Sequence, residues 1–138
     1  SDVNPNNAQT AFNQSLVSAL NHDIESALEY LEKVKFLDPS ELEEWPQFEV
    51  GLLMVNDRMD EAYEQIQRAI SKDPNNNMLI GFLVAVLGNL DRLPEAKEKL
   101  ELFRKMRPDI TSREDYGKVV PDFARDIILQ GMEKAGLS

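Results

Sequence analysis

Prolines recur along this chain at a nearly constant interval. They are separated by 34, 35 and 34 residues, at Pro5, Pro39, Pro74 and Pro108. Alanines keep the same step, each 12 residues before one of the last three prolines, at Ala27, Ala62 and Ala96. A fixed period in this range is typical of a chain built from one repeated supersecondary unit. Because repeat architectures present extended binding surfaces, the period favours binding over catalysis.

The second half of each period has the pattern of an amphipathic helix. Apolar residues with three-and-four spacing fall on one face of such a helix, and this pattern predicts helices over 24–37, 58–72 and 92–106. A proline follows each of them, and proline cannot continue the hydrogen bonding of a helix. The helices are therefore expected to stop at these prolines.

Helices in the first half of each period are predicted over about 8–20, 42–55 and 78–89. The third is apolar on nearly all sides, so we expect neighbouring helices to sandwich it. Its small residues form a stripe that permits close packing, at Gly81, Ala85 and Gly88.

Four polar residues are the expected helix starts. Ser40 and Glu43 have the spacing of a capping box that would open the helix over 42–55. Asp57 and Asp91 stand where N-caps would open the helices that follow them.

The pattern breaks after Pro108. A short helix over about 112–119 and a helix over about 122–135 are expected there, and they would cover the last apolar face of the array. We therefore divide the chain into the tail of a preceding repeat or linker (1–7), three repeats (8–109, as about 8–40, 43–75 and 77–109) and capping helices (110–138). The chain lacks an initiator methionine, which suggests a fragment of a longer protein, or alternatively a cleaved one.

Composition narrows the partners. A net charge of −10 disfavours nucleic acid and anionic membrane surfaces, whose phosphates demand a cationic surface. The chain has no cysteine, which excludes disulfides, thiolate zinc sites and a cysteine nucleophile. No apolar run reaches the roughly 18 residues of a membrane span, and no signal peptide is visible. A cytoplasmic location is the expectation.

Catalytic chemistry has little support in the sequence. The single histidine, His22, lies in a predicted turn beside Asp23, and a lone turn histidine lacks the converging groups that catalysis or metal binding needs. No phosphate-binding glycine loop, paired-histidine motif or nucleophile motif occurs. We therefore expect no enzyme activity, no catalytic or metal-binding residues and no cofactor.

The recurring Ala and Pro, 12 residues apart, and the Glu-Ala pairs that end two of the turns make the chain resemble the tetratricopeptide repeat (TPR) family. The likeness covers about residues 8–109, and the closing stretch over 130–137 resembles the end of TPR arrays in larger bacterial proteins. The resemblance implies an all-α, right-handed α-solenoid of three helix–turn–helix repeats plus C-terminal capping helices. It also implies a non-catalytic scaffold for protein–protein interaction.

In TPR proteins the first helices line a concave groove that binds peptides or protein segments. The resemblance places eight residues in this groove: Gln14, Ser18, Trp45, Phe48, Leu52, Phe82, Val86 and Asn89. Two other readings stay open. Phe48, Leu52, Phe82 and Val86 could simply be core, and Trp45 could pack at a rim.

Charge and end exposure refine the expected partner. The predicted first helices hold no Lys or Arg, which argues against clamping a C-terminal carboxylate. An apolar or basic segment is expected instead, because three carboxylates lie near the groove, at Glu43, Glu44 and Glu49. The alternative function is self-assembly or a regulatory spacer in a larger signalling protein. A homodimer would form through the exposed N-terminal repeat, at Ala11, Phe12, Leu16 and Leu20.

Overall fold

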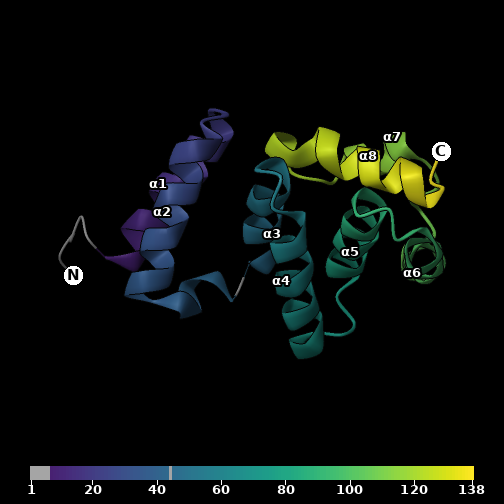
Figure 1. The fold of residues 1–138 in the computed structure, drawn as a ribbon, viewed down its shortest axis with the longest axis horizontal. Helices are drawn as coiled ribbons and strands as arrows, with labels where there is room; N and C mark the ends of the chain where they lie inside the picture. The colour runs from purple at the N-terminus through teal and green to yellow at the C-terminus, as the bar shows by residue number, and fades with distance from the viewer. Residues whose placement is uncertain (1–6, 44) are drawn as a thin grey trace.

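A computed structural model describes residues 7–43 and 45–138, and over these ranges the fold is all-α, with eight α-helices in sequential pairs and no strand (Figure 1). The expectations for residues 1–6 and for Glu44 lie outside the described residues. The elements are α1 (Ala8–Leu20), α2 (Ile24–Leu37), the 3₁₀ helix η1 (Pro39–Leu42), α3 (Pro46–Val55), α4 (Met59–Lys72), α5 (Asn77–Asn89), α6 (Leu93–Met106), α7 (Arg113–Gly117), the 3₁₀ helix η2 (Asp122–Ala124) and α8 (Arg125–Ala135).

Turns of the same geometry join the helices of the first three pairs. One residue in each turn has a left-handed backbone, with φ of 60° at His22 and 59° at both Asp57 and Asp91. Asp and His tolerate this conformation better than most residues that carry a side chain. The turns recur at the step of the sequence period, so this period is also a period of the structure.

The N-caps predicted at Asp57 and Asp91 are wrong by one residue. The capping positions of α4 and α6 are Arg58 and Arg92, and neither arginine caps with its side chain. The aspartates are instead the left-handed residues of the turns. An N-cap residue has a negative φ, so one residue cannot fill both places.

The helix predicted from residue 42 begins later, at Pro46. The carboxylate of Asp38 accepts hydrogen bonds from the Ser40 backbone N–H (3.1 Å) and hydroxyl (2.6 Å), and so caps η1. The predicted capping box of Ser40 and Glu43 is therefore wrong. Proline suits the first turn of a helix but disfavours helical geometry in the residue before it, so Trp45 stays outside α3.

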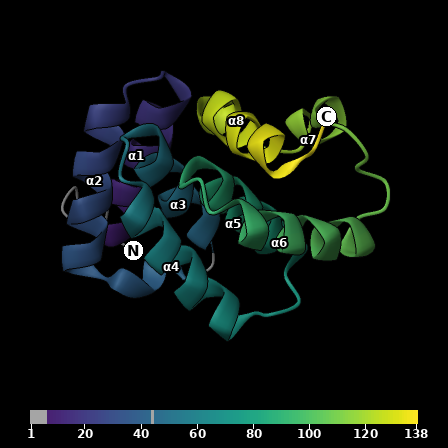
Figure 2. The ribbon, with the colours of Figure 1, turned by 45° about the vertical axis from the view of Figure 1, so that its right-hand side comes forward.

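Helix α5 is the centre of the molecule. Its residues from Leu79 to Gly88 are all buried, because α4, α6 and α8 pack around it (Figure 2). This confirms the expected sandwiched helix. A Cβ atom built on Gly88 would lie 2.0 Å from the Gly131 carbonyl oxygen of α8. The small-residue stripe thus permits the close packing expected of it.

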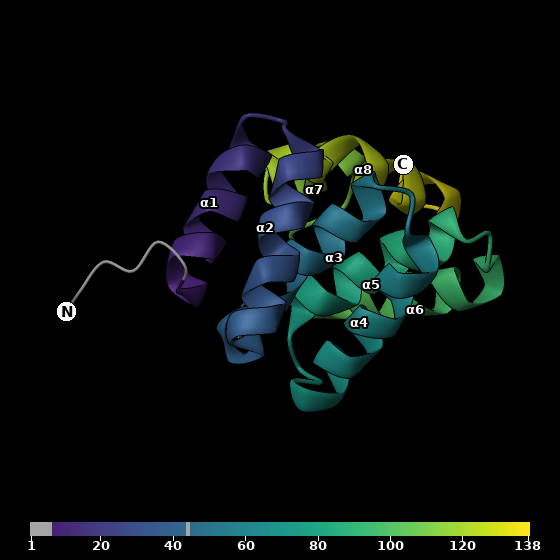
Figure 3. The ribbon, with the colours of Figure 1, turned by 60° about the vertical axis from the view of Figure 1, so that its left-hand side comes forward.

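The C-terminal segment returns across the helix pairs. The short helix predicted over 112–119 is α7, and the one predicted over 122–135 is divided into η2 and α8. Helix α8 packs mainly on α5 and also touches α3 and α6, while η2 reaches α1 and α3 (Figure 3). The end of the chain therefore contacts the first helix pair as well as the last.

The apolar core has two parts. The larger cluster surrounds α5, and the smaller one lies between α1, α2, η1 and the side chains of Phe48 and Leu52. Phe123 of η2 is half-buried, and in the described chain it is the one apolar side chain that packs against both clusters. The contact between the first helix pair and the rest therefore depends strongly on η2.

Candidate binding groove

An apolar groove of about 490 Å³ lies where α1, the starts of α3 and α5, and the chain between α7 and η2 meet. Its polar lining is limited to Gln47, Lys118 and Asp122. The rest of the lining is apolar and comprises Leu16, Ala19, Leu20, Trp45, Phe48, Met78, Val119, Val120, Pro121 and Phe123.

Four aromatic rings support one side of the groove. Trp45 stacks on Phe48 with ring centroids 5.3 Å apart and an interplanar angle of 22°. Phe12 meets the edge of Phe48 at 5.6 Å, and Phe123 meets it at 5.7 Å. Such offset and edge-on arrangements are the favourable geometries for aromatic pairs. Phe48 is fully buried at the centre of this group, so it fixes Trp45 at the groove surface.

The groove rim exposes large aliphatic side chains to solvent. Leu20 near the end of α1 is 73% exposed, and Val119 on the opposite wall is 40% exposed. Val17, one turn before Leu20 on α1, is 56% exposed. Clustered apolar exposure of this kind marks interaction surfaces, because covering it releases ordered water.

One polar atom in the groove wall lacks a partner. The side-chain amide oxygen of Gln47 is buried, and no residue in 7–43 or 45–138 donates a hydrogen bond to it. Buried polar atoms in folded proteins almost always have a partner. The groove therefore combines an apolar surface with one unused hydrogen-bond acceptor.

The charged group at the end of the groove is held in place by its neighbours. The Asp122 carboxylate contacts His22 Nε2 at 3.5 Å and also forms an ion pair with Arg125. Arg125 in turn donates from Nε to the Gly117 carbonyl oxygen at 2.9 Å. These contacts link the turn after α1 to the wall formed by residues 118–123.

Packing against α3 and α5 positions this wall. A Cβ atom on Gly51 would lie 3.2 Å from the Phe123 ring, so the glycine gives this ring its space. Asn89 Nδ2 of α5 donates to the Ile127 carbonyl oxygen at 2.9 Å. The C-terminal segment is therefore a structural part of the groove.

The groove residues predicted from the sequence lie in different environments. Trp45 and Phe48 line the observed groove, Gln14 is exposed and Ser18 is half-buried, but neither of the last two lines it. Asn89 holds the C-terminal segment through the bond to Ile127. The other predicted residues are fully buried in the core, namely Leu52, Phe82 and Val86. Their side chains can contact no ligand in this conformation.

Sequence reasoning did not assign Gln47, Met78 or the wall over 118–123 to the groove. The assignment followed the first helices alone, whereas the chain that completes the groove comes from the far end of the sequence. The order of aliphatic and aromatic residues in Val119-Val120-Pro121-Asp122-Phe123 was the available signal. Proline there ends the short helix and exposes an apolar edge.

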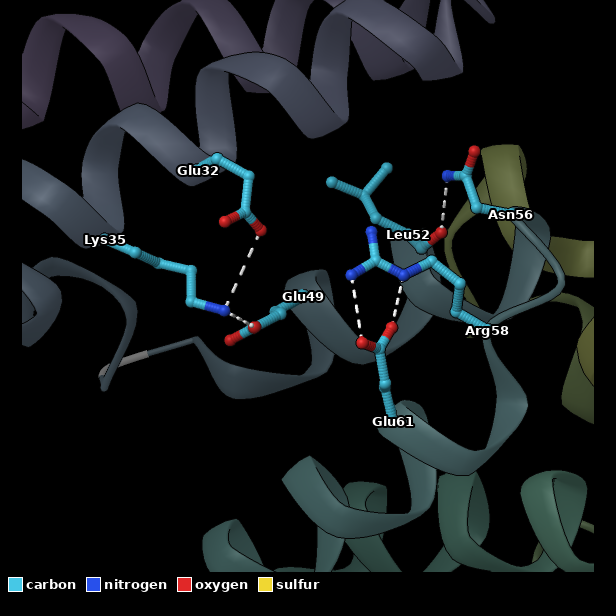
Figure 4. A network of polar contacts seen from close by, with 7 residues as sticks. All are labelled: Glu32, Lys35, Glu49, Leu52, Asn56, Arg58 and Glu61. Carbon is cyan, nitrogen blue, oxygen red and sulfur yellow. Dashed lines mark hydrogen bonds and ion pairs between the residues drawn. The ribbon is translucent and has the colours of Figure 1, made fainter.

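A second, more polar groove of about 350 Å³ lies between α2, α3, α4 and the start of α5. Lys35 reaches Glu49 at 3.0 Å and Glu32 at 3.8 Å across it (Figure 4). Glu43, which was expected beside the binding groove, lies here too and contacts Lys72 at 3.5 Å. These carboxylates are therefore neutralised within the chain and do not face the apolar groove.

An ion pair repeats at the start of α4 and of α6. Arg58 binds Glu61 (Figure 4), and Arg92 binds Glu95 at 2.8 Å. The hydrogen bond from Arg58 lowers the pKa of Glu61, and its partner effect raises the pKa of Arg58. Arg92 also lies over the Tyr63 ring, 4.4 Å from its centroid, and so joins α6 to α4.

Among residues 7–43 and 45–138, no group of three or more His, Asp or Glu side chains is arranged to hold a metal ion. His22 is exposed in its turn, with Asp122 as its neighbour. Within the same residues, no helix has the length and apolar character needed to cross a membrane.

Comparison with protein-family models, with curated proteins and with solved structures gives no match to this chain.

Proposed function

We propose that this chain is a non-catalytic, TPR-like binding module that holds a segment of another protein in the apolar groove. The observation that carries the proposal is the exposed aliphatic rim at Leu20 and Val119 around a surface that includes Trp45. The antiparallel helix pairs with identical turns and a 34- to 35-residue step support the family assignment.

The groove is suited to binding because little of it needs to be ordered. Trp45 is already fixed by its stack on Phe48, and the opposite wall is fixed by the bonds of Asn89 and Arg125. A preformed surface loses less conformational entropy on association than a mobile one. Covering a leucine side chain contributes about 1.5–3 kcal/mol, so the rim can supply a large part of the affinity.

The self-assembly surface expected on the first helix is mostly used inside the chain. Ala11 is fully buried, and Phe12 and Leu16 pack in the smaller core cluster. Leu20 is the member of that set with a large exposed surface. It lines the groove, so we assign it to partner binding instead.

The test is affinity capture from source lysate, followed by dissociation constants of the captured partner for two matched variants. Leu20→Asp places a charge at the groove, whereas Leu102→Asp places one on α6, where the leucine is 40% exposed and lines neither groove described above. We expect Leu20→Asp to weaken binding at least tenfold and Leu102→Asp to leave it unchanged. Equal affinity for both variants contradicts the proposal, and capture of the chain itself alone supports self-assembly.

A further inference from the structure

Resting on the proposed function, we infer that the groove recognises an extended, uncharged apolar stretch whose main-chain N–H donates a hydrogen bond to the Gln47 side-chain oxygen. The inference joins the unpartnered acceptor to the apolar lining around it. It assigns Gln47 a specificity role within the groove.

The acceptor determines the kind of atom that the ligand must present. The Gln47 amide oxygen can only accept hydrogen bonds, so it requires an N–H or O–H donor. It lies in a wall whose neighbours are mainly apolar, including Trp45 and Phe48. A donor that arrives with the ligand would satisfy an atom that is otherwise desolvated without compensation.

The conformation of the ligand follows from which donors are free. In a helix the main-chain N–H groups beyond the first turn already bond to carbonyls four residues earlier. An extended segment keeps its N–H groups available, because each non-proline residue carries a donor that needs a partner. The inferred ligand therefore meets Gln47 as an extended chain.

The rim determines the side chains that accompany this donor. Leu20 and Val119 are exposed on facing walls, and Trp45 is the aromatic surface beside them. A volume of about 490 Å³ falls within the range of about 300–1,000 Å³ typical of ligand sites. It is sufficient for the apolar side chains of a short stretch of chain.

The charges of the groove favour an uncharged contact stretch. The charged lining residues are Lys118 and Asp122, which have opposite sign, and Asp122 already contacts His22 and Arg125. A ligand carboxylate or ammonium in the apolar part would lose water without gaining a partner there. The net charge of −10 adds a general bias against acidic partners.

The experiment uses a displayed library of random nine-residue peptides as the probe, selected on the whole chain and counter-selected on Leu20→Asp. The best peptides are then synthesised with each main-chain amide replaced in turn by an ester, which removes the N–H without adding bulk. Trp45 is the single tryptophan of the chain and lines the groove, so its fluorescence reports binding.

We expect selected peptides with bulky apolar residues and no acidic residue in the contact stretch. One ester position should weaken binding to the native chain about tenfold. The same ester should have little effect on binding to Gln47→Met, which keeps the length of the side chain but removes the acceptor. Circular dichroism of Gln47→Met verifies that this variant is folded.

The contrary results separate the two proposals. Peptides that bind the native chain, fail on Leu20→Asp and tolerate an ester at every position overturn the role of Gln47 but leave the groove as the binding site. An equal ester effect in the native chain and in Gln47→Met also overturns that role. If selection yields no peptide that Leu20→Asp weakens, the proposed function itself fails.

Discussion

Gly131 of α8 lies against Ala85 of α5 so closely that a Cβ atom on Gly131 would stand 2.0 Å from the Ala85 carbonyl oxygen. The atom in the way is backbone, so no side-chain rotation can relieve the overlap. We predict that Gly131→Ala destabilises the protein by about 1–3 kcal/mol, the usual cost of overpacking, or more. Denaturant unfolding followed by circular dichroism measures this loss.

Gly117→Ala is the matched control. A Cβ atom on Gly117 would meet Leu129 at 3.4 Å, which is ordinary van der Waals contact. Alanine favours a helix over glycine by about 1 kcal/mol, so this variant should be as stable as the native chain or slightly more so. Equal stability of Gly131→Ala and Gly117→Ala would show that the two helices can separate freely.

Lys35 neutralises a carboxylate that is nearly removed from solvent. The Glu49 side chain is 9% exposed, and its Oε2 lies 3.0 Å from Lys35 Nζ (Figure 4). We predict that Lys35→Met costs about 1–3 kcal/mol. Loss of one partner of a buried pair costs about 3–5 kcal/mol, but Lys35 itself is partly exposed, so water offsets some of the loss.

The exposed pair of Lys72 and Glu43, at 3.5 Å, provides the comparison. Lys72→Met should change the free energy of unfolding by less than about 1 kcal/mol, as is usual for surface ion pairs. Thermal and urea unfolding of both methionine variants would test the difference. A loss for Lys72→Met as large as that for Lys35→Met would contradict the argument from burial.

Local patterns in the sequence were sufficient for the helix pairs. The apolar period, the prolines after α2, α4 and α6, and the small residues of α5 each act over one or two turns of chain, and the structure follows them. The start of α3 was misplaced for a local reason as well: the prediction gave weight to Ser40 and Glu43 and neglected Pro46, which excludes Trp45 from the helix.

The groove could not be predicted in the same way. Trp45 was identified because aromatic residues often anchor binding sites, but its wall comes from residues about 75 positions later in the sequence. Packing between distant segments leaves no periodic signal in one sequence. The burial of Phe82 and Val86 has the same cause, because α8 and the neighbouring helices cover the faces of α5.

Tyr116 is fully buried, and in the described chain its hydroxyl group has no hydrogen-bond partner. The burial raises the pKa of Tyr116, so the phenol stays neutral at physiological pH. We predict that Tyr116→Phe is neutral or stabilising by up to about 1 kcal/mol, because it removes an unsatisfied buried group while keeping the ring. Its contact with Phe103, at 5.4 Å between centroids, is retained. A loss above 1 kcal/mol in urea unfolding would reveal a partner for the hydroxyl.

Asp115 at the start of α7 should make stability depend on pH in the acid range. Its carboxylate accepts hydrogen bonds from the Thr111 backbone N–H and hydroxyl, both at 3.0 Å. These bonds, the backbone one first, lower the pKa of Asp115 below 3.8. A carboxyl with a lower pKa in the folded state stabilises the protein above the unfolded pKa, and the effect disappears as pH falls through the folded pKa.

We therefore expect Asp115→Asn to be less stable than the native chain at pH 7, with a difference that shrinks as pH falls below about 3.8. Urea unfolding at a series of pH values measures this difference. Asp126, an exposed residue on α8, provides the control as Asp126→Asn. A difference between the native chain and Asp115→Asn that grows towards low pH would reverse the predicted sign.

Phe123 should determine whether the chain unfolds as one unit, because it packs against both core clusters. Replacing a buried phenylalanine with alanine costs about 3–5 kcal/mol, and Phe123 is half-buried, so we expect about 1–3 kcal/mol for Phe123→Ala. The loss should fall unevenly. Hydrogen exchange of the amides in α1 and α2 should accelerate, while exchange in α5 changes little, because local opening no longer needs the larger core. Phe36→Ala, at a phenylalanine that is 88% exposed on α2, should leave both rates unchanged. Equal acceleration in α1 and α5 for Phe123→Ala would show instead that the two clusters open together and that contacts other than Phe123 join them.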